Sequence, residues 1–368
     1  MNFIPLMSPH ITEDDIGAVT EVLRTGMLVQ GQRVEALENA LSEYIGVKHV
    51  VAASSGTATL HLALTALGIK ENDEVIVPAL SHVATANVVE LIGATCVFVD
   101  VEEDTFNIDP GQIENALTPR TRAMIPVHEF GLACEISQVC AIAKDHGLHV
   151  LEDAACALGS AETGRNVGTF GDVASFSLHP RKAITSGEGG FLTTNNRELA
   201  STLRSLRNHG IEIQNGKQHF VAAGFNYRLT DFQAALVHSQ LLRLDQNLER
   251  KKYLAEIYLS ELNGIADIIL PREPDRQRHT WQTFHVLIEN DHNRDELITK
   301  LHQAGIGTNY GAQCIPAQDY YQSKYGLDAE RRFPNSMRSY RSGLALPLYE
   351  KLRDEDVRYI CDVLKREL

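Results

Sequence analysis

The sequence has few of the features that mark secreted, membrane-spanning or metal-binding chains. Its six cysteines contain no CxxC pair and no other metal-ligand spacing, so we expect no metal site and a reducing, cytoplasmic location. No run of 18 apolar residues is present, and the N-terminal stretch MNFIPLMSPHITEDD lacks the pattern of a signal peptide, so no membrane contact is expected. Lys and Arg number 34 against 48 Asp and Glu, and the net charge of −14 disfavours nucleic acid as a partner.

What the 368 residues do contain is 43% apolar residues, enough for one large core and a smaller one. Short apolar strands alternate with helical segments through the first two thirds of the chain. The strands are expected at 47–53, 74–78, 95–100, 123–127, 148–151, 173–178 and 191–194, and helices at 34–45, 113–117 and 136–146. This order predicts an α/β fold in which helices cover a large, mostly parallel sheet.

The last third of the chain has a different order of expected helices and strands. A long helix is expected to begin after Thr230 and to continue to about residue 262. Strands at 283–288 and 307–310 and helices at 295–304 and 354–367 follow it. We therefore predict two domains, a large one over residues 1–245 and a smaller C-terminal α/β domain over residues 246–368.

One lysine, Lys182, lies between two of the expected strands in the segment SFSLHPRKAITSGEGG, residues 175–190. A lysine in a glycine-rich loop is most often a solvated side chain, and the absence of GxxxxGK[ST] argues against a nucleotide P-loop. An earlier strand ends in Glu152 and Asp153, at the edge where α/β sheets collect functional groups. The segment SSGT, residues 54–57, joins a strand to a helix, which favours either an anion site or an ordinary helix cap.

Three motifs, EDAA at 152–155, SFSLHPRK at 175–182 and GEGG at 187–190, resemble the DegT/DnrJ/EryC1/StrS family of sugar aminotransferases. The resemblance covers nearly the whole chain. It implies the fold of fold type I (aspartate aminotransferase-like) transferases and the cofactor pyridoxal 5′-phosphate. By this resemblance, Lys182 bonds to the cofactor aldehyde and then acts as general base, and Asp153 keeps the ring nitrogen protonated.

The resemblance also implies how the rest of the cofactor is held. The expected phosphate ligands are Gly56, Thr57, Ala58 and Ser177. His82 stands where the family usually places an aromatic ring over the pyridine. Cys156 stands where the family often has Gln or His near the phenolic oxygen, and a thiol is a weaker hydrogen-bond donor than either.

Partner and substrate residues follow from the same resemblance. The Asn of the NYR motif, Asn226, is expected to reach the cofactor phosphate of a neighbouring subunit, which predicts a homodimer with shared sites. The expected substrate-binding residues are Leu28, Gln30, Arg228 and Tyr310. Leu28 and Gln30 lie in the loop 26–31, which from its sequence is equally consistent with a plain connector.

The reaction expected from the family is transfer of an amino group from glutamate to a nucleotide-linked keto-deoxysugar, for surface polysaccharide or glycoside biosynthesis. Amination at C4 of a 4-keto-6-deoxyhexose, as in perosamine-type synthases, is preferred over C3. A related sugar dehydratase is disfavoured because that branch has a histidine in place of the lysine. A catalytically silent protein with this fold is disfavoured because Lys182 and Asp153 are both present.

Overall fold

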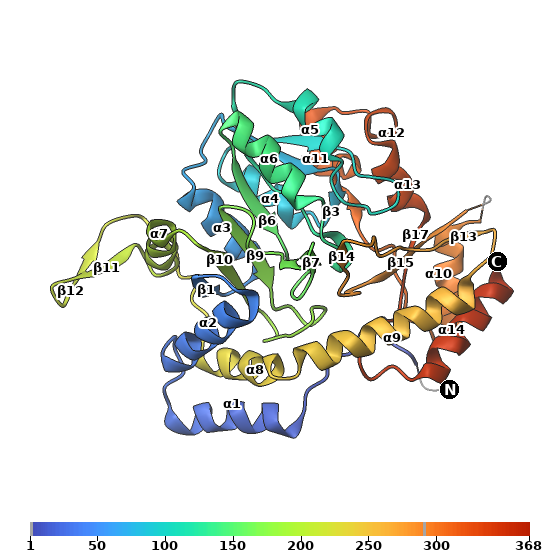
Figure 1. Ribbon diagram of the computed structural model, residues 1–368, viewed down its shortest axis with the longest axis horizontal. Helices are drawn as coiled ribbons and strands as arrows, with labels where there is room; N and C mark the ends of the chain where they lie inside the picture. Colours follow the sequence, from blue (N-terminus) through green and yellow to red (C-terminus); the bar gives the residue numbers. More distant parts are fainter. Residues whose placement is uncertain (1–2, 290–291) are drawn as a thin grey trace.

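The computed structural model describes residues 3–289 and 292–368, and a seven-stranded sheet organises most of them (Figure 1). In order across the sheet, the strands are β1 (His49–Ala53), β10 (Gly190–Thr194), β9 (Val173–Ser177), β6 (His149–Asp153), β5 (Thr121–Met124), β2 (Glu74–Pro78) and β4 (Thr95–Val99). β10 runs antiparallel to both of its neighbours, and the other strands from β9 to β4 pair in parallel. The mostly parallel sheet predicted from the sequence is therefore confirmed.

Helices cover both faces of this sheet, as its strands require, because they are buried along almost their whole length. These helices are α2 (Gln32–Ile45), α3 (Gly56–Ala66), α4 (Ala84–Leu91), α5 (Pro110–Ala116), α6 (Ile136–His146), α7 (Arg197–Arg207) and α8 (Asp231–Leu241), and α1 (Glu13–Thr25) packs on the outer side of α8. α2 illustrates how the pattern works: Val34, Leu37, Leu41 and Ile45 form one apolar stripe, and all four are buried against the sheet core.

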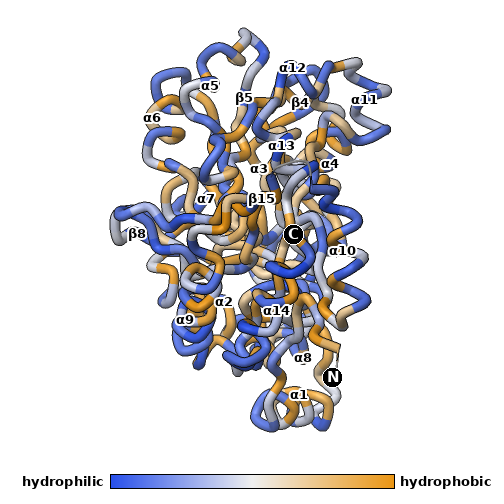
Figure 2. The backbone as a smooth tube through the Cα atoms, turned by 90° about the vertical axis from the view of Figure 1, so that its right-hand side faces the viewer, coloured by the Kyte–Doolittle hydropathy of each residue, from blue (hydrophilic) through white to orange (hydrophobic). Residues whose placement is uncertain are grey.

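The C-terminal part builds its own core around a three-stranded sheet of β13 (Ile268–Ile269), β15 (Phe284–Ile288) and β17 (Gly343–Leu346). The helices α9 (Leu244–Leu262), α10 (Arg294–Gln303) and α14 (Asp354–Glu367) pack around this sheet, and α13 (Pro334–Ser342) contacts both β15 and β3 (Leu80–Ser81). The helices α11 (Asp319–Tyr325) and α12 (Ala329–Arg332) pack with the larger core. Figure 2 shows hydrophobic stretches inside and hydrophilic ones outside. The division at residue 245 stays a prediction, since Ile4 packs in this core while Ile315 and Tyr321 pack with the larger one.

The N-terminal segment joins the C-terminal core through its backbone as well. The Ile4 N–H donates to the Gly305 carbonyl at 2.7 Å, and the Gly307 N–H donates to the Ile4 carbonyl at 2.8 Å. Ile4 thus pairs through its backbone with a segment about 300 positions later in the chain.

Several short strand pairs connect or extend these layers. They are β3 (Leu80–Ser81) with β16 (Gln313–Cys314), β14 (Gln277–Arg278) with β7 (Ala161–Glu162) and β8 (Arg165–Asn166), and the hairpin of β11 (Ile211–Gln214) and β12 (Lys217–Phe220). The β3–β16 pair brings a C-terminal segment onto the edge of the large part. The β11–β12 hairpin projects from the body at the left of Figure 1 and leaves Ile213 and Phe220 exposed.

Two expectations from the sequence were wrong. The long helix after Thr230 is two helices, because Arg243 leaves the helical conformation and its guanidinium binds Asp15 and the His10 carbonyl. The strand expected at 307–310 does not form. Within that segment only Asn309 makes a bridge, to Ala345, so its four residues do not form a ladder.

Candidate active site

A cavity of about 1080 Å³, its open mouth included, lies where the carboxyl ends of β6 and β9 meet the start of α3. This is the edge of an α/β sheet at which ligands usually bind. Two C-terminal segments, residues 282–283 and 311–313, complete its wall. The pairing of β3 with β16 places the second of these segments.

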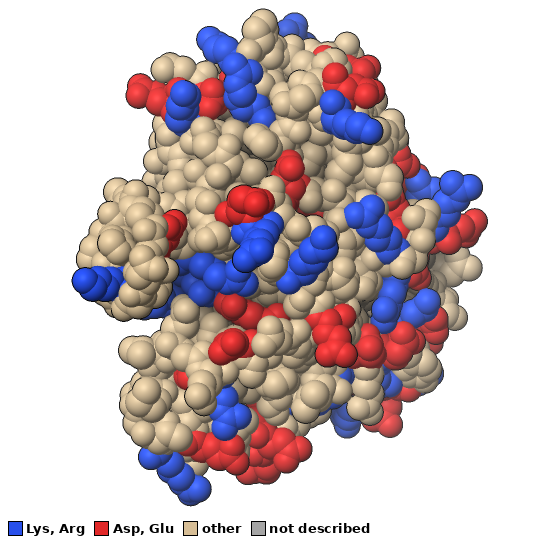
Figure 3. Space-filling view, turned by 60° about the vertical axis from the view of Figure 1, so that its left-hand side comes forward, with Lys and Arg blue, Asp and Glu red and all other residues tan. Residues whose placement is uncertain are grey.

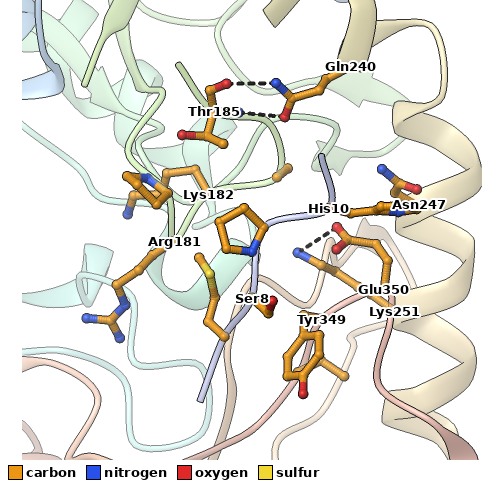
Figure 4. A pocket seen from close by; sticks show the side chains of 15 residues that line it. Ser8, His10, Arg181, Lys182, Thr185, Gln240, Asn247, Lys251, Tyr349 and Glu350 are labelled. Atoms are coloured by element: carbon orange, nitrogen blue, oxygen red, sulfur yellow. Dashed lines mark hydrogen bonds and ion pairs between the residues drawn. The ribbon is translucent and has the colours of Figure 1, made fainter. Parts of the chain in front are cut away.

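The Lys182 loop is fixed from behind by a pair of hydrogen bonds to α8. The Thr185 N–H donates to Gln240 Oε1 at 3.1 Å, and Gln240 Nε2 donates to the Thr185 carbonyl at 2.7 Å (Figure 4). The Thr185 hydroxyl also donates to the Leu178 carbonyl at 2.8 Å, which closes the loop back onto the end of β9. The loop that carries the lysine is therefore a braced turn, and this favours a fixed position for its amine.

The Lys182 side chain extends into the cavity, where its Nζ donates to Cys156 Sγ at 3.1 Å. Burial raises the pKa of the Cys156 thiol, and the positive charge of Lys182 opposes that rise. The thiol is a soft, weak acceptor, so it holds the amine in place without the strong bond that a carboxylate would form. Lys182 thus remains available to react with an electrophile in the cavity.

The adjacent carboxylates at the end of β6, Glu152 and Asp153, lie on opposite faces of the strand, one buried and the other in the cavity wall. Asp153 lines the cavity, where Oδ2 accepts the Thr85 hydroxyl at 2.8 Å and Oδ1 accepts the Ala155 N–H at 3.2 Å. Glu152 is fully buried on the other face, bonded to His128 at 3.1 Å and to the N–H groups of residues 168, 170 and 171. Despite burial, which opposes ionisation, these bonds lower the pKa of Glu152. Glu152 is structural, and Asp153 faces the chemistry.

The start of α3 forms an anion cradle. The Ser55 side chain caps the helix by accepting the Ala58 N–H at 3.0 Å, so the helical first-turn N–H groups of Gly56 and Thr57 face the cavity without a helical partner. A Cβ at Gly56 would lie 3.0 Å from Cβ of Ser177, so a side chain there would press on Ser177. The cradle therefore contains Gly56, Thr57 and Ser177, whereas the buried Ala58 does not line the cavity and its N–H is already used.

The structure places the remaining predicted residues in two groups. His82 lines the cavity, and its Nδ1 accepts the Ala84 N–H at 3.2 Å. Leu28, Gln30, Asn226, Arg228 and Tyr310 do not line it. The Leu28 carbonyl accepts the N–H of Asp231, which follows the NYR segment closely, so the loop 26–31 and the NYR segment lie near each other. The Arg228 side chain itself donates to Asn208.

Many residues of the cavity lining were not predicted from the sequence, and three of them are polar groups that bear on its chemistry. Thr85 lies on the first turn of α4 and binds Asp153, Gln282 approaches from the C-terminal part, and Glu129 lies in the 3₁₀ turn η1 (Glu129–Gly131) after β5. A threonine in a helix and a glutamate in a turn are ordinary surface residues by composition. Only the pairing of distant strands brings them to the cavity, so no sequence signal could have identified them.

The rest of the described chain offers little for competing classes of ligand. Figure 3 shows basic and acidic side chains interspersed over one face. Elsewhere in the described chain many charged side chains form ion pairs, such as Arg338 with Glu289 and Arg243 with Asp15. Within residues 3–289 and 292–368, no group of three or more His, Cys, Asp or Glu is placed to hold a metal ion. None of the helices in those ranges combines the length and apolar character needed to cross a bilayer.

Comparison with known proteins identifies the family of enzymes to which this cavity belongs. Residues 9–365 match the DegT/DnrJ/EryC1/StrS aminotransferase family. This chain belongs to that family. The spore coat polysaccharide biosynthesis protein SpsC of Bacillus subtilis is 38% identical over 377 residues, which cover 99% of this chain and 97% of SpsC. Together with the solved structures of sugar aminotransferases that this chain resembles, the match shows that it is a pyridoxal-phosphate-dependent nucleotide-sugar aminotransferase.

Solved structures agree with that assignment. The Streptococcus pneumoniae sugar aminotransferase Spr1654 in its PLP-form superposes with a TM-score of 0.92 at 29% identity, over 100% of this chain and 99% of that chain. Helicobacter pylori PseC, an aminotransferase of pseudoaminic acid biosynthesis, superposes with a TM-score of 0.94 at 27% identity, over 100% and 99% of the two chains. The fold type I architecture implied by the motifs is thus confirmed.

The residues present in the cavity fit pyridoxal phosphate. A doubly charged phosphate matches the start of α3, where a Cβ on Gly56 would fill the space beside Ser177. Asp153 and Lys182 supply a carboxylate for a ring nitrogen and an amine for an aldehyde. A buried oxygen of Glu129 is also left without a partner, as expected for a site built around an occupant.

Proposed function

We propose that this aminotransferase transfers the amino group of glutamate to C4 of a nucleotide-linked 4-keto-6-deoxyhexose. One observation carries the proposal: Lys182, Asp153 and the cradle at Gly56 converge on a single open cavity. The named roles of SpsC in spore coat polysaccharide and of PseC in pseudoaminic acid biosynthesis support a product destined for surface polysaccharide. C3 amination of a 3-keto sugar is the alternative, and the nucleotide stays open among GDP, dTDP and UDP.

Each proposed role follows from where its residue lies. Pyridoxal phosphate supplies an aldehyde carbon and an electron-withdrawing ring, which lowers the barrier to removing a proton beside the bound nitrogen. The Lys182 amine would hold the cofactor through that aldehyde, and as a free amine it would move the proton as general base. Asp153 holds a proton on the ring nitrogen, because a carboxylate beside the nitrogen stabilises its positive charge. The Thr85 hydroxyl orients Asp153 for this role.

We further propose that the active unit is a homodimer in which each subunit completes the partner's site. Asn226 is exposed and does not line the cavity of its own chain. The adjacent hairpin leaves Ile213, Phe220 and Val221 exposed, and apolar side chains of this size favour burial in an interface. Leu28, Gln30 and Arg228 would act with Asn226 at the site of the partner, and Tyr310 at the mouth of its own.

The remaining expectations stay proposals of the same kind. A reducing cytoplasm agrees with six free cysteines in the described chain. The smaller α/β core built from residues after 245 would close over the sugar, because its residues 311–313 form one wall of the cavity.

The experiment that tests the reaction is a panel of nucleotide-linked 3-keto and 4-keto sugars incubated with the purified enzyme and glutamate. Mass spectrometry would detect the exchange of a carbonyl oxygen for an amine, and NMR of the product would locate it. Amination at C4 supports the proposal, and amination confined to C3 favours the alternative. Loss of water without nitrogen uptake would instead indicate a dehydratase, and failure to bind the cofactor would indicate a silent protein.

A further inference from the structure

Glu129 is a buried carboxyl group in the cavity wall with no partner for one of its oxygens. Its side chain is 5% exposed, and Oε2 is shielded from solvent without any hydrogen bond. Its backbone is fixed, because its N–H donates to Asn107 Oδ1 at 2.8 Å. An unpaired buried oxygen costs free energy, so an occupant of the cavity that bonds to Oε2 would recover that cost.

The surroundings of Glu129 favour its neutral form. Burial raises its pKa to about 7, and the negative charge of Asp153 adds to the rise. The positive charge of Lys182 and hydrogen bonds from Ser81 and the Phe130 backbone oppose this rise in the pKa. The other titratable group that faces it is Cys156, whose own pKa is raised by Glu129. Near neutral pH a large fraction of Glu129 is therefore a carboxylic acid, which can donate a hydrogen bond.

The order of the strands places Glu129 relative to the cofactor. β6 lies between β9 and β5, so Asp153 at the end of β6 separates Ser177, at the end of β9, from Glu129, which follows β5. In pyridoxal phosphate, the phosphate arm and the phenolic oxygen lie on opposite sides of the line from the ring nitrogen to the aldehyde. With the phosphate on the Ser177 side and the nitrogen at Asp153, the phenolic oxygen faces the side of Glu129.

We propose that Glu129, as a neutral acid, donates a hydrogen bond to the phenolic oxygen of pyridoxal phosphate, a contact for which Cys156 is too weak a donor. The inference rests on the cofactor position proposed above and not on the identity of the sugar. It makes Glu129 a cofactor-binding residue and explains why a carboxyl group remains buried with one oxygen unpaired. Glu129 would be a second donor beside the Cys156 thiol, in place of the Gln or His that the family often has at the position of Cys156.

Binding of two ligands to matched variants tests the contact. Pyridoxal phosphate is compared with its 3-deoxy analogue, which lacks the phenolic oxygen, in the native protein, Glu129→Leu and Glu129→Gln. Glu129→Leu should lose about tenfold in affinity for pyridoxal phosphate, the scale of one hydrogen bond to a charged group, and nothing for the analogue. Glu129→Gln keeps an N–H donor and should lose less. Equal losses for both ligands, or no loss for either, would overturn the proposal.

The visible absorption of the bound cofactor gives a second readout. A donor at the phenolic oxygen stabilises its negative charge and so lowers the pKa of the nitrogen that joins Lys182 to the cofactor. Glu129→Leu should therefore raise the pH at which the visible band changes, while Glu129→Gln stays near the native value. A fall in Glu129→Leu would mean that Glu129 acts as an anion and would contradict the assignment.

A matched control separates local from general effects. Glu102 is a half-buried carboxyl group whose pKa is also raised by burial, but it does not line the cavity. Glu102→Gln should leave both readouts unchanged. If borohydride fails to fix the cofactor on Lys182 of the native protein, the proposed function fails first. If the cofactor is fixed on Lys182 as expected but the Glu129 variants match the native protein in both readouts, only the Glu129 contact is contradicted.

Discussion

The Thr85 hydroxyl donates a 2.8 Å hydrogen bond to Asp153 Oδ2, from the first turn of α4 to the end of β6. A short side chain on one element thereby orients the carboxylate of another. The Ala155 N–H holds the second oxygen at 3.2 Å. With both oxygens held in this way, Asp153 lines the cavity, where a ring nitrogen would bind.

Asp153→Asn should retain most of the cofactor and lose most of the rate. The cradle and Lys182 still bind pyridoxal phosphate, but an amide cannot stabilise a charged ring nitrogen. We expect kcat to fall about a thousandfold, or about 4 kcal/mol. Thr85→Val, which removes only the orienting bond, should cost about tenfold. Stopped-flow transamination assays with cofactor content measured in parallel would check both, and near-normal turnover in Asp153→Asn would contradict the role of the aspartate.

Lys182→Ala should abolish transamination and leave the fold intact, because the lysine side chain lies in a cavity and fills no apolar core. In the native enzyme, borohydride should fix the cofactor on this lysine. Peptide mapping by mass spectrometry locates the label, and circular dichroism confirms the fold of the variant. A label on Lys144, on α6, would show that the assignment is wrong.

Glu152→Gln should destabilise the protein most at neutral pH. Because the pKa of Glu152 is lowered in the folded state, its contribution is complete above the unfolded value of about 4.3 and is lost as the pH falls further. We expect a loss of about 2 kcal/mol in the free energy of unfolding at pH 7. Urea unfolding at several pH values measures it, with the exposed Glu114→Gln on α5 as control. A gap that stays constant from neutral to strongly acidic pH would rule out this linkage.

Two inactive variants should restore activity when their subunits exchange. Lys182→Ala is mixed with the double variant Asn226→Ala and Arg228→Ala. If Asn226 and Arg228 act across a twofold interface, one site of each mixed dimer is complete, and equal random mixing should return about a quarter of native activity. Native mass spectrometry confirms the exchange. Exchange without recovered activity would mean that Asn226 and Arg228 do not act on the neighbouring site.

The periodic elements could be predicted from sequence because burial imposes their pattern. The helices expected at 136–146 and 354–367 have the same bounds in the structure. Lys182 and Asp153 line one cavity because the parallel strands that precede them end at the same edge of the sheet. The break at Arg243 could not be foreseen, since it depends on an ion pair with Asp15, 228 positions away. Glu129 was missed for the same reason: its burial comes from neighbours that are remote in sequence.

The rung formed by Ile4 beside Gly305 and Gly307 constrains the order in which the molecule can assemble during translation. Ile4 leaves the ribosome before its partners, which emerge about 300 residues later, on the order of 15–60 s at roughly 5–20 residues per second. Throughout that interval the segment has no place to dock, while the large sheet can already pair strand by strand. The smaller core therefore closes last, and the nascent chain carries an apolar N-terminal end that chaperones can bind until synthesis is almost complete.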